Sequence, residues 1–215
     1  MKTLIVKINP KKPEPAKIKL AVTILKQGGL VAFPTDTVYG LGALATNSAA
    51  VKKIYKVKKR SLSSPLPILI SKRDDLKKYT FTAPKIKKLI NKFWPGPLTI
   101  VLKKKKIISS AVTAGKKSVG VRVPANPVAL ALISALDQPL TVTSANISNK
   151  KSSTTAREVK KYLNNKIDLI LDGGKTKLGR ESTVLDLTTS PPAILRSGAV
   201  SVKNLEKYLG KIIKK

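Results

Sequence analysis

The sequence predicts a single α/β domain with a mixed, largely central sheet, because strands and amphipathic helices alternate along the chain without internal repeats. Its 215 residues, 42% of them hydrophobic, favour one well-buried domain over two. Capping residues stand where several helices are expected to begin, which supports the same alternation. We therefore treat residues 1–215 as one domain that starts with a strand and a Pro-rich connection in residues 1–15.

The helices are predicted from apolar periodicity and from end signals. Between Ile18 and Leu25, apolar residues recur at the i, i+3, i+4, i+7 spacing of one helix face, and a Gly pair at 28–29 ends this helix. Asn126 before Pro127 is a typical N-cap, and T-A-R-E at 155–158 is a capping box for a helix through Tyr162. Further helices are expected at 48–57, at 84–94 after Thr82 and Pro84, and at 202–213, where a basic amphipathic helix closes the chain.

The strands are predicted from short apolar runs, and the segment 35–47, which is rich in hydroxyls and glycine, is assigned no strand. The expected strands are 3–8, 30–34, 66–71, 97–103, 118–124, 140–146, 167–171, 182–187 and 193–196. Function in α/β folds concentrates in the loops beyond strand ends. The polar turns at 34–40, 58–65, 142–146 and 179–184 are therefore the candidate site segments.

The composition restricts the possible chemistry. The chain has no Cys and no His, which excludes thiolate and imidazole nucleophiles, Cys or His zinc sites and disulfides. Lys and Arg number 43 against 11 Asp and Glu, a formal charge of +32, which favours anionic partners without choosing among them. No apolar run is long enough for a membrane span or a signal sequence, so we expect a cytoplasmic protein.

Lys58 is the residue that the helical pattern does not explain. In the helix predicted at 48–57, Val51, Ile54 and Tyr55 form the apolar side, and the other lysines lie on the solvated side. If the helix continued, Lys58 would fall in the middle of the apolar side. A lysine there must snorkel outward, mark the helix end or direct its ammonium into an interior cleft. Arg60 follows on a loop, where its planar guanidinium suits a phosphate or a carboxylate.

Eight motifs in a fixed order are together far more specific than any one of them. They are FPTDTVYGLGALATN, K-x-R followed by PL at 65–66, FWPGPLTIVL, VGVRVP, TSANIS, LDGGKT, ESTVLDL and ILRSGAV. Over roughly residues 16–210 the chain resembles the YrdC-like family, whose members include threonylcarbamoyl-AMP synthases. The resemblance implies a twisted mixed sheet around a concave, positive cavity, in the short, single-domain form of the family.

The implied reaction joins L-threonine, bicarbonate or CO2, and ATP into threonylcarbamoyl-AMP and pyrophosphate, for threonylcarbamoyladenosine formation in tRNA. The amine of threonine would form a carbamate that attacks the α-phosphate, so positioning and charge neutralisation suffice. Mg2+ is implied as the cofactor, held mainly by the ATP phosphates. Further candidate partners are tRNA or double-stranded RNA and a downstream threonylcarbamoyl transferase.

The resemblance also assigns residues. The four implied catalytic residues are the K-x-R pair Lys58 and Arg60 and the S-x-N pair Ser144 and Asn146. The residues implied to bind ATP are Lys58, Arg60, Ser64, Ser118, Asn146, Thr154 and Arg196, and those implied to bind threonine are Thr35, Arg122, Ser144 and Ser182. Tyr39 is expected to shape the cavity wall. Asp36 is expected to stabilise its turn, a role that we favour over help with the amine proton.

The chain departs from the family pattern at four positions. Lys59 and Ser61 stand where the family often has Gly and Pro, and Leu69 and Asn126 stand where many relatives have His. Two rival functions stay open: an RNA-binding module without adenylate chemistry, and a relative that forms carbamoyl-adenylate. The first rests on the charge of the chain, and the second normally occurs inside a much longer chain.

Overall fold

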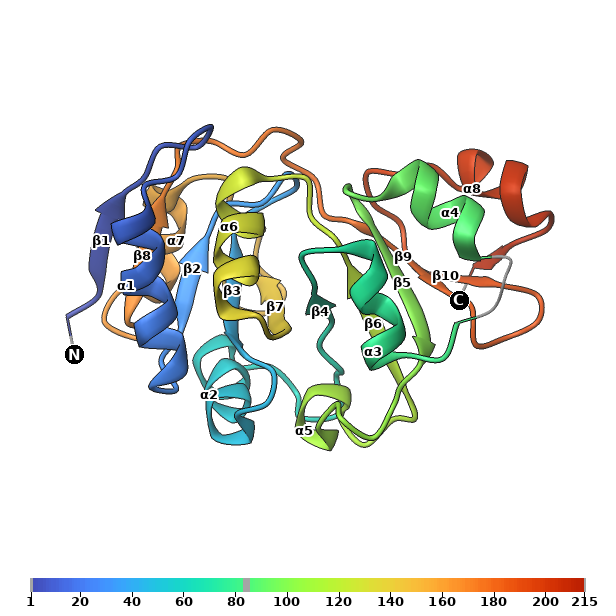
Figure 1. Ribbon diagram of the computed structural model, residues 1–215, viewed down its shortest axis with the longest axis horizontal. Helices are drawn as coiled ribbons and strands as arrows, with labels where there is room; N and C mark the ends of the chain where they lie inside the picture. Colours follow the sequence, from blue (N-terminus) through green and yellow to red (C-terminus); the bar gives the residue numbers. More distant parts are fainter. Residues whose placement is uncertain (1, 83–85, 215) are drawn as a thin grey trace.

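The computed structural model describes residues 2–82 and 86–214, and an 11-stranded mixed sheet runs through this part of the chain (Figure 1). Its strands are β1 (Leu4–Lys7), β2 (Val31–Phe33), β3 (Gly40–Leu44), β4 (Ile68–Leu69), β5 (Leu98–Lys103), β6 (Ser118–Arg122), β7 (Leu140–Ser144), β8 (Leu169–Asp172), β9 (Thr183–Asp186), β10 (Ala193–Arg196) and β11 (Ile213–Lys214). Their order is β1-β8-β2-β3-β7-β4-β6-β5-β9-β10-β11, with both parallel and antiparallel neighbours. The predicted α/β fold with a mixed sheet is confirmed.

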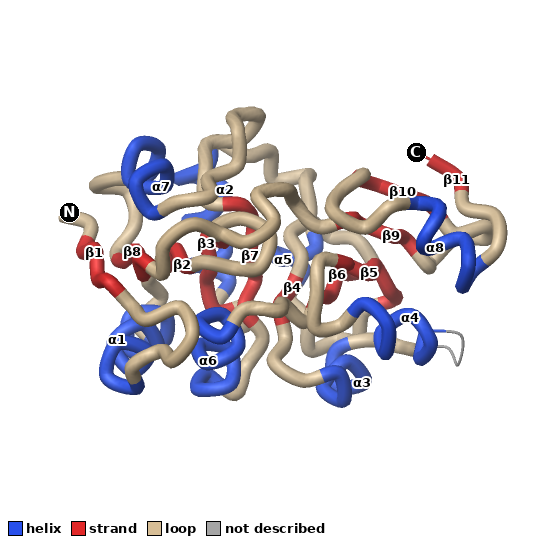
Figure 2. Tube along the Cα trace, turned by 90° about the horizontal axis from the view of Figure 1, so that it is seen from above, coloured by secondary structure: helices blue, strands red, loops and turns tan. Residues whose placement is uncertain are grey.

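Helices cover both faces of this sheet. They are α1 (Pro15–Lys26), α2 (Ser48–Lys58), α3 (Leu76–Tyr79), α4 (Ile86–Phe93), α5 (Ser110–Thr113), α6 (Pro127–Leu136), α7 (Ala156–Leu163) and α8 (Val202–Leu209), with a 3-10 turn at Arg73–Asp75 before α3. Helices α1, α6, α3 and α4 lie on one side of the sheet, and α2 and α7 lie on the other (Figure 2). Among the described residues, no helix is long and apolar enough to cross a membrane.

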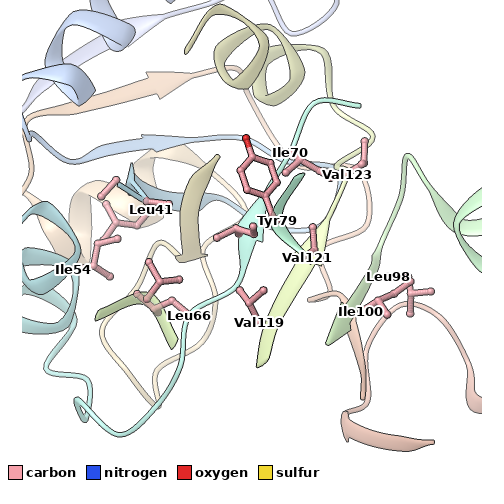
Figure 3. Close-up of a cluster of buried hydrophobic side chains, with 14 of the residues drawn as sticks. Leu41, Ile54, Leu66, Ile70, Tyr79, Leu98, Ile100, Val119, Val121 and Val123 are labelled. Carbon is pink, nitrogen blue, oxygen red and sulfur yellow. The ribbon is translucent and has the colours of Figure 1, made fainter. Parts of the chain in front are cut away.

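Two apolar clusters hold these layers together. Helices α1 and α6 pack on β2, β7 and β8 in a cluster that includes Leu25, Phe33 and Leu132. The larger cluster joins α2 and α7 to strands that include β3, β5, β6 and β9, and Figure 3 shows Leu41 of β3 and Ile54 of α2 within it. Burial of such side chains contributes about 1.5–3 kcal/mol each. The strand ends, and with them the polar turns, are therefore fixed by packing on both faces.

Strand β3 was not predicted, because it lies in the stretch 35–47, which is rich in hydroxyls and glycine. Gly40 and Gly42 give the segment a turn-like composition, yet both residues pair in the ladder. A Cβ at Gly40 would lie 2.6 Å from Val142 Cγ1, and one at Gly42 would lie 2.9 Å from Phe33 Cε1. Here glycine permits the close approach of neighbouring side chains rather than a turn. That requirement is tertiary, so the local sequence signal misled the prediction.

The end of the chain also differs from its prediction. Helix α8 ends at Leu209, and Gly210 follows with a φ of 73°. Its ψ of −146° does not continue a helix, and a positive φ is readily adopted by glycine, so the helix predicted for 202–213 is too long. Residues Ile213–Lys214 instead form β11, which pairs in parallel with β10.

The capping predictions fared better. The Asn126 side chain accepts hydrogen bonds from the backbone N–H groups of Val128 and Ala129, so the predicted N-cap is confirmed. Thr155 caps α7 through the backbone N–H of Glu158, but the Glu158 carboxylate accepts from the Thr154 N–H instead of the expected Thr155 N–H. The start signal at Pro84 lies outside the described residues, and the described part of α4 is Ile86–Phe93.

Candidate active site

A cavity opens in the middle of the sheet, beside the ends of β3, β7, β4, β6 and β9. It encloses about 580 Å³ including its open mouth. Its lining residues come from sequence-distant segments and are Thr35, Thr37, Val38, Tyr39, Gly40, Arg60, Pro67, Leu69, Thr99, Arg122, Val142, Thr143, Ser144, Glu181, Ser182 and Arg196. Three of these side chains are guanidinium groups and one is a carboxylate, so the cavity is positively charged.

Six of the residues assigned by resemblance line this cavity, namely Thr35, Arg60, Ser144, Arg122, Ser182 and Arg196. The sheet order explains why they meet. Gly40 of β3 pairs with Ser144 of β7, and Leu69 of β4 pairs with Arg122 of β6. Strand ends that are far apart in sequence therefore share one edge of the cavity.

Lys58 lies beneath the turn that follows β7 rather than in the cavity wall. Helix α2 continues to Lys58, whose side chain is 1% exposed and so falls on the apolar side of the helix. Its Nζ donates to the carbonyl oxygens of Ser144 and Asn146, each at 2.5 Å, and to Asn146 Oδ1 at 3.3 Å. An ammonium group has three N–H donors, so this turn uses all of them. Two of the three alternatives for Lys58 hold together: it is the last residue of α2, and its ammonium is directed into the interior.

The environment of Lys58 disfavours its charge. Burial, and secondarily the nearby Arg60 guanidinium, lower the pKa of Lys58 to about 7. A negatively charged ligand in the cavity would raise that pKa again. Charge at Lys58 is thus coupled to anion binding.

Lys59 adopts a left-handed conformation, with φ 52° and ψ 42°, at the C-cap of α2. This explains why Gly suits the position between the Lys and Arg of the motif, since a left-handed L-residue is strained. We expect Lys59→Gly to raise the free energy of unfolding by about 1 kcal/mol in chemical denaturation. Lys56→Gly, inside the same helix, is the matched control and should lower it by about 1 kcal/mol. Equal losses in both variants would contradict the strain at Lys59.

Arg60 is held at the cavity by the loop that follows it. Its Nε donates to the Ser64 carbonyl at 3.3 Å and its NH2 group to the Pro65 carbonyl at 3.1 Å. The Tyr55 hydroxyl donates to the same Ser64 carbonyl, at 3.1 Å. Ser64 therefore acts here through its backbone, as a support for Arg60. Burial lowers the pKa of Arg60, although the side chain keeps its charge at neutral pH.

The turn of Ser144 and Asn146 joins Lys58 to the cavity. Asn146 is buried, and its Nδ2 donates to the Lys150 carbonyl at 2.5 Å, which closes the turn. The backbone N–H of Ser148 donates to the Lys58 carbonyl, so α2 and the turn hold each other in both directions. Ser144 contributes a hydroxyl to the cavity lining.

Arg122 dominates another wall of the cavity. It is 6% exposed, and it forms an ion pair with Asp36 while its Nε donates to the Gly96 carbonyl at 2.8 Å. Its NH1 group donates to the Thr37 hydroxyl at 3.0 Å, and that hydroxyl lies 2.9 Å from the Thr35 hydroxyl. Three of the five N–H groups of the guanidinium are thus engaged, which leaves two for a ligand carboxylate.

Asp36 supports Arg122 from behind. Its Oδ1 also accepts from the Ala125 N–H at 3.0 Å, so it ties the loop after β2 to the end of β6. Asp36 Oδ2 is buried without a hydrogen-bond partner among the described residues. The contacts favour the expected turn-stabilising role over a role at the substrate amine.

Ser182, Arg196 and Glu181 form the remaining polar wall. Arg196 donates from Nε and NH2 to the Ser182 carbonyl at 3.1 and 2.9 Å, and from NH2 to the Ser182 hydroxyl at 3.0 Å. Its NH1 group lies 2.5 Å from Glu181 Oε2. Glu181 was not predicted as a site residue, although it stands in the turn at 179–184, because the hydroxyl residues of that turn carried the prediction.

The other assigned residues lie outside the cavity lining. Ser118 begins β6, four residues before Arg122, which places it about 13 Å along the strand. The Thr154 hydroxyl donates to Glu158 at 3.0 Å and so takes part in the cap of α7. The Ser64 carbonyl supports Arg60, and the turn that contains Asn146 is held by Lys58. The assignment of Ser118, Thr154, Ser64 and Asn146 to ATP binding stays a prediction.

Three further sequence expectations concern Tyr39, Leu69 and Asn126. Tyr39 lines the cavity, and its hydroxyl donates to the Gly174 carbonyl at 2.7 Å, while burial raises its pKa. Leu69 also lines the cavity, as an apolar side chain where many relatives have His. Asn126 is occupied as the N-cap of α6, which gives it a structural role that needs no imidazole.

Residues 23–198 match the Sua5/YciO/YrdC family profile, described as "Telomere recombination". The chain belongs to this family. It is 44% identical over 197 residues to the threonylcarbamoyl-AMP synthase of Pyrococcus abyssi, which covers 91% of this chain and 58% of that protein. It is 39% identical over 180 residues to a putative threonylcarbamoyl-AMP synthase of Methanocaldococcus jannaschii, which covers 84% of each.

Solved structures agree with this membership. P. abyssi Sua5 in complex with L-threonine superposes with a TM-score of 0.95 at 42% identity, over 99% of this chain and 63% of that one. Escherichia coli YciO superposes with a TM-score of 0.86 at 30% identity, over 94% and 98%. The chain thus spans a little over half the length of the P. abyssi relative.

Proposed function

We propose that this family member forms threonylcarbamoyl-AMP and pyrophosphate from L-threonine, CO2 or bicarbonate, and ATP, for threonylcarbamoyladenosine synthesis in tRNA. The observation that carries the proposal is the convergence, in one cavity, of Arg122 and its hydroxyl neighbours with Arg60 and Arg196. Such a cavity suits two anionic groups at once, an amino-acid carboxylate and a triphosphate. The names of the P. abyssi relative and of its threonine complex support the same substrates.

The reaction requires bond rearrangement but no enzyme nucleophile. The deprotonated amine of threonine forms an N–C bond to CO2, and an oxygen of the resulting carbamate attacks the α-phosphorus. The bond from that phosphorus to the bridging oxygen breaks, and pyrophosphate leaves. Arg60 and Arg196 would stabilise the charge on the phosphates, while Lys58 would keep the Ser144–Asn146 turn in place.

Mg2+ is part of this proposal as a companion of ATP. The described residues contain no group of three or more His, Cys, Asp and Glu side chains that could hold a metal ion. This donor set suits an ion that binds through the triphosphate and water, as Mg2+ commonly does. Bound in that way, Mg2+ would neutralise phosphate charge.

Pyrophosphate release from ATP and Mg2+ tests the proposal. We expect release only when both L-threonine and bicarbonate are present, because the carbamate must form before the α-phosphate is attacked. Release that is indifferent to threonine would contradict the proposed substrate. Release that requires carbamoyl phosphate instead would support the carbamoyl-adenylate relative.

RNA binding and cytoplasmic location belong to the proposal as well. Threonylcarbamoyladenosine is a tRNA modification, so a hand-over of the adenylate to a threonylcarbamoyl transferase is the expected next step. The net charge of +32 suits RNA phosphates. Salt-dependent tRNA binding together with a complete lack of pyrophosphate release would support the RNA-binding module in place of the enzyme.

A further inference from the structure

Glu181 is the one acidic side chain among the described residues that line the cavity. Its Oε1 accepts from the Ser152 hydroxyl at 2.6 Å, and its Oε2 pairs with Arg196. Its backbone is also fixed, because the Glu181 carbonyl accepts from the Ala199 N–H at 2.9 Å. The carboxylate is therefore held in a defined place at the cavity wall.

The surrounding charges make this place unusual. Arg60, Arg122 and Arg196 line the same cavity, and Lys58 lies just beneath it. An amino acid at neutral pH carries an ammonium group as well as a carboxylate, and three guanidinium groups repel an ammonium. Asp36, the partner of Arg122, lies outside the lining, so Glu181 is the carboxylate that the described part of the lining presents to a ligand.

The position of Glu181 in the chain also places it between two kinds of ligand-binding group. It precedes Ser182, whose hydroxyl faces the cavity within 2.9 Å of the Thr99 hydroxyl, and it contacts Arg196 on β10. Glu181 thus stands between the hydroxyl-lined wall and an arginine suited to phosphate. We expect the reacting amine near this junction, because the carbamate that forms on it must reach the α-phosphorus while the substrate carboxylate binds elsewhere.

We propose that Glu181 binds the α-ammonium group of the amino-acid substrate and accepts its first proton. This inference rests on the proposed function. The proton moves from nitrogen to the carboxylate, and the freed electron pair forms the N–C bond to CO2. The second N–H proton leaves to water as the carbamate forms. The nearby guanidinium groups assist, because positive charge lowers the pKa of a bound ammonium.

The structure also offers a route by which the proton can leave Glu181. The Glu181 side chain is 28% exposed, so a protonated carboxyl can return its proton to solvent after each turnover. The chain has no histidine that could take this part. A carboxylate that is both anchored and partly solvated suits a base that must be regenerated.

The test compares two ligands in two proteins. L-threonine and its analogue with a hydroxyl in place of the α-amino group are titrated calorimetrically, with Mg2+ and a non-hydrolysable ATP analogue present. We expect Glu181→Gln to weaken threonine binding about 10- to 100-fold and binding of the hydroxy analogue less than about 3-fold. Equal losses for both ligands would overturn the inference, because they would indicate a structural role.

Two control variants separate charge from packing. Ser152→Ala removes the hydrogen bond to Oε1 but keeps the carboxylate, so threonine binding should change less than about 3-fold. Glu206→Gln makes the same chemical change at an exposed position of α8 and should have no effect. A loss in Ser152→Ala as large as in Glu181→Gln would count against direct binding of the amine.

A pH profile tests the proton transfer. In Glu181→Gln, kcat/KM for threonine should rise about 10-fold per pH unit below the ammonium pKa, because only the free amine then reacts. The unaltered chain should show a shallower rise. If excess Mg2+ restores the variant instead, Glu181 is a metal ligand and the inference fails. If the unaltered chain shows no threonine-dependent pyrophosphate release, the proposed function itself fails.

Discussion

Replacing Lys58 by methionine should reduce threonine-dependent pyrophosphate release by about 100-fold or more, while the protein stays folded. The reason is the turn after β7, whose Ser144 and Asn146 oxygens all accept from the Lys58 ammonium. Methionine fills a similar volume but donates nothing, so these oxygens lose their partners and the turn shifts. Ser144 then leaves its place in the cavity lining.

The matched control is Lys52→Met, which changes an exposed lysine of the same helix and should keep full activity. Lys53 is a poorer control than its exposure indicates, because its Nζ donates to the Gly28 carbonyl at 2.8 Å. Thermal unfolding of both variants establishes that they are folded. Activity of Lys58→Met above about a tenth of normal would contradict the role of the turn.

The same variant provides a stability test with a defined sign. The pKa of Lys58 is about 7 in the folded protein and 10.5 in the unfolded chain, so folding disfavours the charged form. The contribution of Lys58 to the free energy of unfolding is greatest above pH 10.5, where the side chain is neutral in both states. This contribution is lost as the pH falls toward 7. The free energy of unfolding of the unaltered chain, minus that of Lys58→Met, should therefore rise between about pH 7 and pH 10. A flat difference would contradict the lowered pKa.

Replacing Arg122 by methionine should lower the free energy of unfolding by about 3–5 kcal/mol. The variant leaves the Asp36 carboxylate buried and without its ion pair, and one oxygen of that carboxylate already lacks a hydrogen bond among the described residues. The uncompensated charge in the interior causes most of this loss, because a buried carboxylate has neither solvent nor a counter-charge to stabilise it. Chemical denaturation measures the loss.

A second substitution tests the cause of that loss. In Arg122→Met with Asp36→Asn, the buried negative charge is gone, so the double variant should be more stable than Arg122→Met by about 2 kcal/mol. Threonine binding should be absent in both variants, because the guanidinium that we propose as the partner of the substrate carboxylate is missing from both. If the second substitution adds a further loss of stability, unpaired charge is not the reason for the first.

Much of the fold follows from local signals. Apolar periodicity placed α1 and α2, and the capping residue Asn126 placed the start of α6. Helical phase also marked Lys58 as a misfit, and its burial confirms that the helix carries it to the apolar side. These features depend on residues within a few positions of one another, so the sequence contains enough information to predict them.

Other features depend on distant partners. Gly40 and Gly42 belong to a strand because Val142 and Phe33 approach them, and no nearby residue signals that approach. Likewise, the place of the Glu181 carboxylate is fixed by its contacts with Ser152 and Arg196, which lie 29 and 15 positions away. Sequence reasoning weighed the hydroxyl residues of the same turn and overlooked the carboxylate. Nothing local indicates that it is the sole acid among the described residues of the cavity lining.

By itself, the sequence determined the α/β class, most helix and strand positions, the exclusion of His and Cys chemistry, and the motif residues that resemblance assigned. Only the tertiary structure decided how these residues are used. It placed Lys58 under the Ser144–Asn146 turn and Asp36 behind Arg122, and it left Glu181 at the wall. The physical reason is that charge and hydrogen bonding act over a few ångströms in space, and the order of strands in the sheet sets which groups come that close.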